Sequence, residues 1–364
     1  MSAREDQSID FTLDTASELA SAEHGPIEGK SPWTLAWRRL RRNYVALASL
    51  GVFLLVVVVC CLAPVYAHDV AHTGPNSVHL GETIKIHGKE VPVVSIGYME
   101  TIKGVVHFHA GGAPLGPQWG AAGGRYILGG DQLGRDTAVR ILYGGLNSLR
   151  VGILSAAICI MMAVTLALLA GFYRGSVDWV ISRFFDLVWA FPAILLAIAL
   201  GAALSLNGIH WGPIHVSGGN IWIPTFVIAF VTVPYVGRPL RGQVLSLREK
   251  EFVEAARGQG ASNVRIMFRE ILPNIASTVL VLFTLIVAGN ILIEAGLSFL
   301  GAGVQPPNPS WGNLIADGED RIQTAPWLAI VPGVAIVITA VSLNIFGDGL
   351  RDALDPRAKV RVGR

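Results

Sequence analysis

Long runs without a charged residue constrain this chain more than any other feature. They cover residues 45–67, 151–173, 187–237, 271–293 and 322–347. A helix of about 20 apolar residues is long enough to cross the hydrocarbon core of a bilayer. The run at 187–237 is about twice that length, and asparagine, glycine and proline residues interrupt its middle, so we interpret it as two helices joined by a loop. The sequence therefore predicts an all-α membrane protein with six transmembrane helices.

Composition excludes two other classes of protein. Hydrophobic residues make up 52% of the chain and charged residues 15%, whereas a soluble domain carries about 25% charged residues. A disordered chain needs low hydrophobicity and high charge. The formal net charge of +2 is too small to indicate a nucleic-acid partner. Because all three cysteines lie in apolar runs, no disulfide framework is expected.

Lys and Arg are distributed unevenly between the predicted helices. The loop at 238–270 carries seven of them and the tail after residue 347 carries five, whereas the loop at 294–321 contains only Arg321. Loops rich in Lys and Arg stay in the cytoplasm, and the long loop after the first helix exceeds the length to which this rule applies. We therefore expect both termini to be cytoplasmic.

The predicted helices and loops divide the chain into five segments. These are a cytoplasmic tail at 1–44, a first transmembrane helix at 45–67, an extracytoplasmic insertion at 68–148, a core of five helices at 149–349 and a cytoplasmic tail at 350–364. A cleaved signal peptide is the alternative interpretation of the first helix, but the 44 residues that precede it are too many for an ordinary n-region.

Within the first tail, residues 31–44 alternate tryptophan and leucine with arginine. This pattern predicts an amphipathic helix on the inner membrane surface, with its arginines toward anionic headgroups. Ser31 is expected to cap this helix, and Pro32 suits its first turn.

The insertion at 68–148 predicts a small β-containing piece. Two strands at 83–86 and 91–94 are expected to form a hairpin, and a third strand is expected at 102–109. Six of the nine histidines of the chain lie in this insertion; they are His68, His72, His79, His87, His107 and His109. A metal site is one interpretation, and a polar surface is the other, because no carboxylate or cysteine at ligand spacing completes a site. A membrane-embedded metal sensor or enzyme therefore stays as an alternative function.

The cytoplasmic loop at 238–270 has the pattern of two short helices around a glycine turn. A helix is predicted over 246–257 and ends at Gly258 and Gly260. Ser262 is the expected N-cap of a second helix, and Pro273 marks the return to the membrane. Small residues at the bend leave room for another protein surface, so we favour a docking element over a plain linker.

Here the residues carry a family resemblance. Glu254-Ala255-Ala256, followed by Gly260 and by Leu272-Pro273, resembles the "EAA" loop of ABC importer permeases, although Glu270 stands where the family usually has isoleucine. In that family the loop couples the permease to a cytoplasmic ATPase. The resemblance implies a coupling role for eight residues: Phe252, Glu254, Ala255, Ala256, Gly258, Gly260, Ala261 and Ser262.

Three more stretches are similar to the oligopeptide/dipeptide subfamily. They are 31–43, 129–144 (with Gly130 in place of the usual threonine) and 296–313. The resemblance covers about residues 31–60 and 128–357, and it leaves the insertion at 70–124 outside. It implies the six-helix fold of an importer permease and a location in the inner or plasma membrane of a bacterium or archaeon.

Polar residues near the outer end of the fifth helix are candidates for the cargo route. Asn290 and Glu294 are four residues apart and share one helix face. An ionisable group within a span usually faces a bundle interior or a water-filled path; the alternative is a hydrogen bond at the membrane surface. Pro306 and Pro307 stiffen the following loop, and with Trp311 they are assigned to an outer gate or binding-protein contact. Four further residues are expected to hold the outer loop together by ion pairs: Asp131, Arg135, Asp136 and Arg140.

No phosphate-binding G-x-x-x-x-G-K-[ST] motif occurs in the chain, so the energy source is expected on another subunit. We expect no catalytic residue, no metal site and no cofactor on this chain. The resemblance implies ATP and Mg²⁺ on two cytoplasmic ABC ATPase domains, a homologous second permease subunit and an extracytoplasmic solute-binding protein. It also implies a peptide cargo, an oligopeptide or a dipeptide.

Overall fold

The computed structural model describes residues 32–95, 97–102, 105–109, 111–119, 123–211 and 214–355. Long helices dominate it. They are α3 (Tyr44–Cys61), α5 (Thr137–Tyr173), α8 (Trp222–Arg248), α11 (Leu272–Phe299) and α13 (Trp327–Leu354). The shorter helices are α2 (Pro32–Arg42), α4 (Ala63–Val65), η1 (Tyr66–Val70), α6 (Gly175–Trp189), α7 (Ala193–Asn207), α9 (Glu251–Gly258), α10 (Asn263–Arg265), η2 (Ile266–Ile271) and α12 (Trp311–Glu319).

Five helical segments of the described chain are long and apolar enough to cross a membrane. The remaining predicted crossing, the third along the chain, is instead a pair, α6 and α7, bent by 89° and long enough only when both halves are counted. We expected this crossing to begin at residue 187, but α6 begins at Gly175 and ends at Trp189. Pro192 explains the break, since proline has no N–H to donate and disfavours helical geometry in the residue before it.

Two other helices are longer than the charge-free runs that predicted them. Helix α5 begins at Thr137, well before residue 151, because Asp136 caps it and accepts hydrogen bonds from the amides of Ala138 and Val139. Helix α8 continues to Arg248 and contains Pro234 and Pro239. The expected continuous helix at 246–257 is therefore wrong: α8 ends at Arg248, and α9 starts separately at Glu251.

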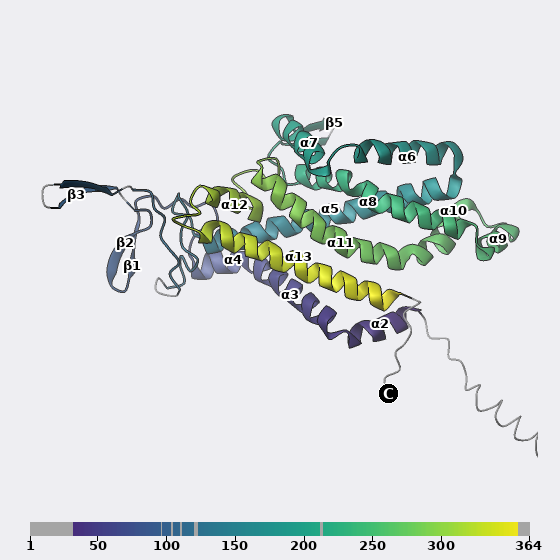
Figure 1. The fold of residues 1–364 in the computed structure, drawn as a ribbon, viewed down its shortest axis with the longest axis horizontal. Coiled ribbons are helices and arrows are strands. Elements are labelled where there is room, and N and C mark those ends of the chain that lie inside the picture. Colours follow the sequence, from purple (N-terminus) through teal and green to yellow (C-terminus); the bar gives the residue numbers. More distant parts are fainter. Residues whose placement is uncertain are drawn as a thin grey trace, which may run out of the picture.

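Small residues allow the long helices to approach closely. A Cβ atom at Gly171 of α5 would lie 2.6 Å from Val244 Cγ1 of α8, and one at Gly145 would lie 2.6 Å from Trp311 Cζ2. Glycine at such positions is typical of helix packing in membranes. Helix α5 thus runs against α8 and α11, with α3 and α13 beside them (Figure 1).

The insertion forms two separate hairpins. Strands β1 (Thr83–Ile86) and β2 (Lys89–Pro92) pair as predicted, although β2 starts earlier than expected. The turn residues His87 and Gly88 both have positive φ, 49° and 78°, as tight two-residue hairpins require. The single strand expected at 102–109 is wrong, because β3 (Tyr98–Ile102) and β4 (Val105–His109) form a second hairpin. A third, unpredicted pair, β5 (Ile209–Trp211) and β6 (Ile214–Val216), follows α7.

The hairpins and the loop before α11 lie at opposite ends of the bundle. In Figure 1 strands β1 to β3 project from one end, and α9 and α10 form the other. Helix α2 lies beside the end of α13, on the α9 side of the molecule. The helix predicted near residues 31–44 is confirmed as α2; its expected cap, Ser31, lies outside the described residues.

Candidate functional site: a coupling segment and an outer collar

Residues 249–271 join α8 to α11, and we call them the coupling segment. Helix α9 starts after Lys250, which has extended backbone geometry. Glu251 and Glu254 lie in its first turn and Arg257 in its last; these charges complement the helix dipole. These local charges favour the short helix, and packing of Val253 against the bundle adds to its stability.

A glycine turn ends α9. Gly260 has φ of +78°. Its amide donates to the Arg257 carbonyl (2.9 Å), and the Ala261 amide donates to the Ala256 carbonyl (3.0 Å). This pair of bonds around a left-handed residue is the Schellman motif, which favours glycine. Gly260, expected in a coupling role, is thus also favoured by the backbone of the turn, whereas Ala256 and Ala261 contribute only main-chain groups to it.

A second helix follows and merges with the fifth long helix. The Ser262 side chain accepts from the Arg265 amide (3.4 Å), as the sequence predicted for an N-cap. Helix α10 continues into the π-type turn η2 and then into α11. Pro273 lies at the start of α11 and lacks an N–H for the regular ladder, and π-type turns accommodate such interruptions.

One side of the coupling segment is anchored in the core. Val253 is fully buried, with Ile266 and Ile271, against Phe172 of α5 and Val244 of α8. The Arg257 guanidinium lies 5.5 Å from the centre of the Phe172 ring. Because α9 shares one apolar cluster with α5, α8 and α11, a displacement of α9 acts on three long helices.

The other side is open and apolar. The exposed fractions of Phe252, Val264 and Phe268 are 38%, 58% and 59%. Glu254, Ala255, Gly258 and Ser262 are exposed as well. A Cβ atom at Gly258 would meet no atom within 4 Å, so packing within this chain does not require glycine there. Phe252 lies on α9, whereas Val264 and Phe268 lie within Asn263–Phe299, a segment apolar enough to cross a membrane, so lipid or a partner protein can cover these side chains.

Ion pairs connect this end of the bundle. Arg174, between α5 and α6, pairs with Glu249, and Arg241 of α8 pairs with Asp178 of α6. The Arg174 guanidinium lowers the pKa of the Glu249 carboxyl below its ordinary value. Both partners of the Arg174–Glu249 pair are largely exposed, so its contribution to stability is small.

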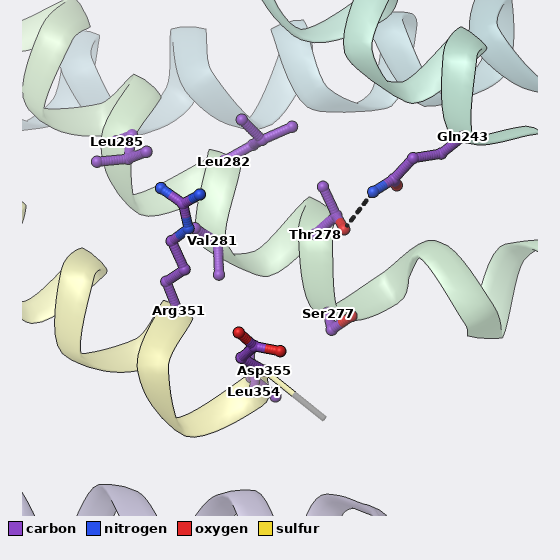
Figure 2. A pocket seen from close by; sticks show the side chains of 9 residues that line it. All are labelled: Gln243, Ser277, Thr278, Val281, Leu282, Leu285, Arg351, Leu354 and Asp355. Atoms are coloured by element: carbon purple, nitrogen blue, oxygen red, sulfur yellow. Dashed lines mark hydrogen bonds between the residues drawn. The ribbon is translucent and has the colours of Figure 1, made fainter. Parts of the chain in front are cut away.

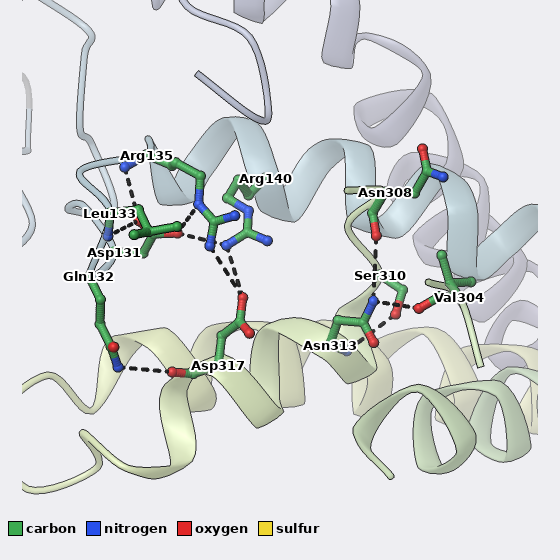
Figure 3. Close-up of polar contacts among 10 residues, drawn as sticks. All are labelled: Asp131, Gln132, Leu133, Arg135, Arg140, Val304, Asn308, Ser310, Asn313 and Asp317. Atoms are coloured by element: carbon green, nitrogen blue, oxygen red, sulfur yellow. Dashed lines mark hydrogen bonds and ion pairs between the residues drawn. The ribbon is translucent and has the colours of Figure 1, made fainter. Parts of the chain in front are cut away.

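At the opposite end, four charged side chains form what we call the outer collar (Figure 3). Asp131 Oδ2 accepts from Arg135 Nε (2.6 Å) and from Arg140 Nη1 (2.7 Å). Arg140 Nη1 also contacts Asp317 Oδ2 of α12 at 3.0 Å. The expected ion pairs are thus present for Asp131, Arg135 and Arg140. Asp136 has another role, as the cap of α5.

The carboxyl group of Asp136 is buried in the same region. Its Oδ2 accepts from the Tyr126 amide (2.6 Å), and the Tyr126 hydroxyl donates to the Gly134 carbonyl (2.9 Å). Burial raises the pKa of Asp136, while these backbone amides act in the opposite direction. The segment before α5 is therefore held by its own internal bonds.

Asn290 and Glu294 are completely buried between α5, α11 and α12. Asn290 Nδ2 donates to Ser155 Oγ (2.8 Å), and Ser298 Oγ donates to Glu294 Oε1 (2.6 Å). Glu294 therefore does not reach the membrane surface, and that alternative is wrong. Within this chain the two side chains face packed protein; Glu294 Oε2 and Asn290 Oδ1 have no hydrogen-bond partner among the described residues.

The loop after α11 carries the predicted gate residues. Ser298 Oγ accepts from the Val304 amide (3.0 Å), which ties the start of the loop to α11. Pro306 and Pro307 are exposed beyond this point. Trp311 is not: its indole Nε1 donates to the Ile141 carbonyl (3.1 Å) inside the bundle. The structure thus places the two prolines on a surface and Trp311 in the core.

A groove lies at the inner end of α13 (Figure 2). Its volume is about 380 Å³. Gln243 of α8 donates to Thr278 of α11 across one wall (3.0 Å), and Arg351 and Asp355 stand on the other. Val281, Leu282 and Leu285 also line it. No pattern in the sequence predicted this groove, because residues of three separate helices, α8, α11 and α13, build it.

The described histidines of the insertion do not gather into a metal site. Among the residues that the structure describes, no group of three or more His, Cys, Asp or Glu side chains is placed to hold a metal ion. The His79 ring forms hydrogen bonds with the side chains of Thr73 (2.8 Å) and Glu82 (2.9 Å). These bonds give His79 a structural role within the insertion. The side chains of His107 and His109 lie outside the described part.

Sequence reasoning missed Asp317 and Arg174. Asp317 lies 177 positions from Arg140, and Arg174 lies 75 positions from Glu249. No spacing rule connects such residues. The only hint in the sequence was that Asp317 and Arg174 are charged residues close to the ends of predicted helices.

Comparison with known proteins identifies the family. The family of binding-protein-dependent transport system inner membrane components matches this chain over residues 163–360. The model of the N-terminal TM domain of oligopeptide transport permease C matches residues 31–80.

Curated relatives agree along almost the whole chain. A dipeptide transport system permease protein of Alkalihalophilus pseudofirmus is 36% identical over 90% of this chain and 91% of the relative. A glutathione transport system permease protein of Pectobacterium atrosepticum is 34% identical over 91% and 93%. Among solved structures, an inward-facing MetNI methionine ABC transporter matches with a TM-score of 0.48 and 16% identity, covering 59% of this chain and 96% of that one. The chain belongs to the family of inner membrane permease components of binding-protein-dependent ABC transport systems.

Proposed function

We propose that this permease subunit forms half of a pathway that imports peptides, and that the coupling segment docks on a cytoplasmic ABC ATPase. The relatives named for dipeptide and glutathione transport support a small peptide as cargo. The observation that carries the docking proposal is the two-sided coupling segment: Val253 is buried in the core, while Phe252, Val264 and Phe268 are exposed.

The proposal places both termini in the cytoplasm, with a homologous second permease completing the pathway. Two ATPase domains would hold ATP and Mg²⁺ and contact the eight coupling residues from Phe252 to Ser262. Coupling of the ATPase to transport requires that the contacts between the ATPase and the coupling segment differ between two states of the transporter. Val253 carries the resulting displacement into α5, α8 and α11, because all of these contribute to one apolar cluster.

At the other end, we assign the exposed Pro306–Pro307 loop to the outer gate and to contact with an extracytoplasmic solute-binding protein. Glu294 supports this gate from within, because it accepts from Ser298 and Ser298 accepts from the Val304 amide. Asn290 bonds Ser155 and so holds α11 against α5. Trp311 fixes α12 against α5. The cargo route itself then lies between this subunit and the second permease.

The test uses Gly258, where a side chain would meet no atom of this chain. Gly258→Trp is expected to reduce recovery of the ATPase with the purified permease pair by at least about tenfold, because a large side chain blocks a close surface. Recovery of the second permease should be unchanged. Gly242→Trp is the matched control, since Gly242 of α8 is also exposed with no atom within 4 Å of its Cβ position.

Unchanged ATPase recovery with Gly258→Trp would overturn the docking proposal. Gly260 is a poorer test position, because its positive φ strains any other residue whether or not a partner docks. Uptake of labelled dipeptides by the reconstituted transporter tests the cargo separately. Intact ATPase docking without any peptide uptake would contradict the peptide assignment alone.

A further inference from the structure

Helix α2 has one occupied face and one basic face. Its 11 residues include four arginines and no acidic residue. Ala36 and Leu40 are buried, and Leu40 packs with Leu350 and Ala353 at the end of α13. The remaining surface carries three exposed arginines: Arg38, Arg41 and Arg42.

The fold holds this basic face in a fixed position. Arg39 Nη1 donates to the Asp355 carbonyl at 2.7 Å, which ties α2 to the end of α13. Asn43, between α2 and α3, accepts from the Ala46 amide at 3.1 Å. Gly349 of α13 lets Ala46 approach closer than any side chain would permit. Helix α2 is therefore part of the bundle rather than a loose extension.

Aromatic residues indicate the depth of α2 in the membrane. The first membrane-spanning segment begins at Tyr44, directly after α2. The exposed fractions of Trp37 and Tyr44 are 56% and 81%. Exposed tryptophan and tyrosine at the end of a span are typical of the lipid headgroup region. The basic face thus lies where phospholipid headgroups lie.

The arginines of this face are available to an anionic ligand. Within the described part of the chain, no acidic side chain pairs with Arg38, Arg41 or Arg42. Arg41 lies over the Trp37 ring at 5.6 Å. Guanidinium groups bind phosphate oxygens through two parallel hydrogen bonds, and basic residues at a membrane surface strengthen binding to anionic lipid.

We propose that α2 is a binding site for anionic phospholipid headgroups of the adjacent leaflet, with Arg38, Arg41 and Arg42 contacting the phosphates. The proposal rests on the cytoplasmic orientation of this end given above. Lipid bound here braces the end of α13, which also forms the Arg351–Asp355 wall of the inner groove (Figure 2). The basic face of α2 then binds lipid in addition to its effect on the orientation of the chain in the membrane.

The experiment uses the complete transporter, purified with its partner subunits and reconstituted into phosphatidylcholine vesicles with or without phosphatidylglycerol. Binding is measured as quenching of tryptophan fluorescence by brominated phosphatidylglycerol, and a Trp37→Phe variant identifies the Trp37 signal. Each removed arginine is expected to weaken binding about fivefold. The triple variant R38Q/R41Q/R42Q should therefore bind about 100-fold more weakly, whereas R38K/R41K/R42K keeps the charge but loses the paired hydrogen bonds and should bind with an affinity between the two.

Equal quenching in the glutamine and unaltered proteins would overturn the proposal, and so would equal quenching by brominated phosphatidylcholine. Loss of ATPase recovery in the glutamine variant, with lipid binding intact, would assign the face to a protein partner instead. Lipid binding is measured without cargo. If peptide uptake failed while arginine-dependent binding persisted, the proposed function would fall and the lipid site would stand.

Discussion

The outer collar and the coupling segment, at the two ends of one bundle, differ in which kind of side chain is buried and which is exposed. In the outer collar, the Arg140 side chain is almost fully buried, and its partners Asp131 and Asp317 come from this same chain. In the coupling segment, the side chains of Phe252, Val264 and Phe268 are exposed, and no other part of the described chain covers them. A charged group that is buried must be paired to be stable, whereas an exposed apolar group is stabilised only when another surface covers it.

The two ends therefore differ in the contacts that stabilise them. The outer end is completed by the chain itself and can hold a fixed geometry for α5 and α12. At the end that carries the coupling segment, Phe252, Val264 and Phe268 stay exposed within this chain, and this surface is available to lipid or to another protein. Substitutions at the outer end should therefore act on folding, and substitutions at the inner end on assembly.

The largest effect is expected at Arg140. Arg140→Ala removes one of the two guanidinium partners of the buried Asp131 carboxylate and leaves Arg135 in place, and breaking a buried ion pair costs at most about 3–5 kcal/mol. Thermal and denaturant unfolding of the purified protein in detergent measure it. Asp317→Asn is the control, because Asp317 is half exposed and an exposed pair contributes at most about 1 kcal/mol. Similar losses from the two variants would contradict this account of the outer collar.

A smaller effect is expected at Glu294. Glu294→Ala removes the acceptor of the Ser298 hydroxyl, and an unsatisfied buried polar group costs about 1–3 kcal/mol. The loop after α11 should also loosen, so that a cysteine placed at Asn308 reacts faster with a soluble maleimide. Glu294→Gln keeps one side-chain oxygen and should react more slowly than Glu294→Ala. Identical labelling rates in all three proteins would show that Glu294 does not support the loop.

In the coupling segment the two glycines should respond with opposite signs. Gly260→Ala places a Cβ in the left-handed region and should lower the free energy of unfolding by about 1–2 kcal/mol. Gly258→Ala, inside α9, should raise it by about 0.5–1 kcal/mol, because no atom lies near the added methyl group. Denaturant unfolding measures both. A destabilised Gly258→Ala protein would mean that packing within the chain requires this glycine.

The smallest effect is expected for the exposed Arg174–Glu249 pair. Because Arg174 lowers the pKa of Glu249, the pair stabilises the folded state at pH values above the ordinary Glu pKa of 4.5. This contribution is lost as the pH falls through the lowered folded pKa. The melting temperatures of the unaltered and Arg174→Ala proteins should therefore differ slightly at neutral pH and converge in acid. A difference that grew in acid would contradict the sign.

Sequence patterns predicted the parts of the fold that depend on neighbouring residues. The charge-free runs marked the long helices, and Gly260 with Ser262 marked the turn and cap of the coupling segment. The break between α8 and α9 at Glu249 and Lys250 escaped prediction, because both residues are compatible with a helix; in the structure Lys250 is extended and Val253 packs into the core.

The sequence by itself determined that this chain lies in a membrane and presents a glycine-ended helical turn at one end of its bundle. The tertiary structure alone decided that Arg140 meets Asp317 across 177 positions and that Glu294 is sealed among serines instead of facing lipid. The reason is physical. Hydropathy, capping and backbone preference act within a few residues, whereas a charge inside a membrane protein is tolerated only where distant helices bring it a partner.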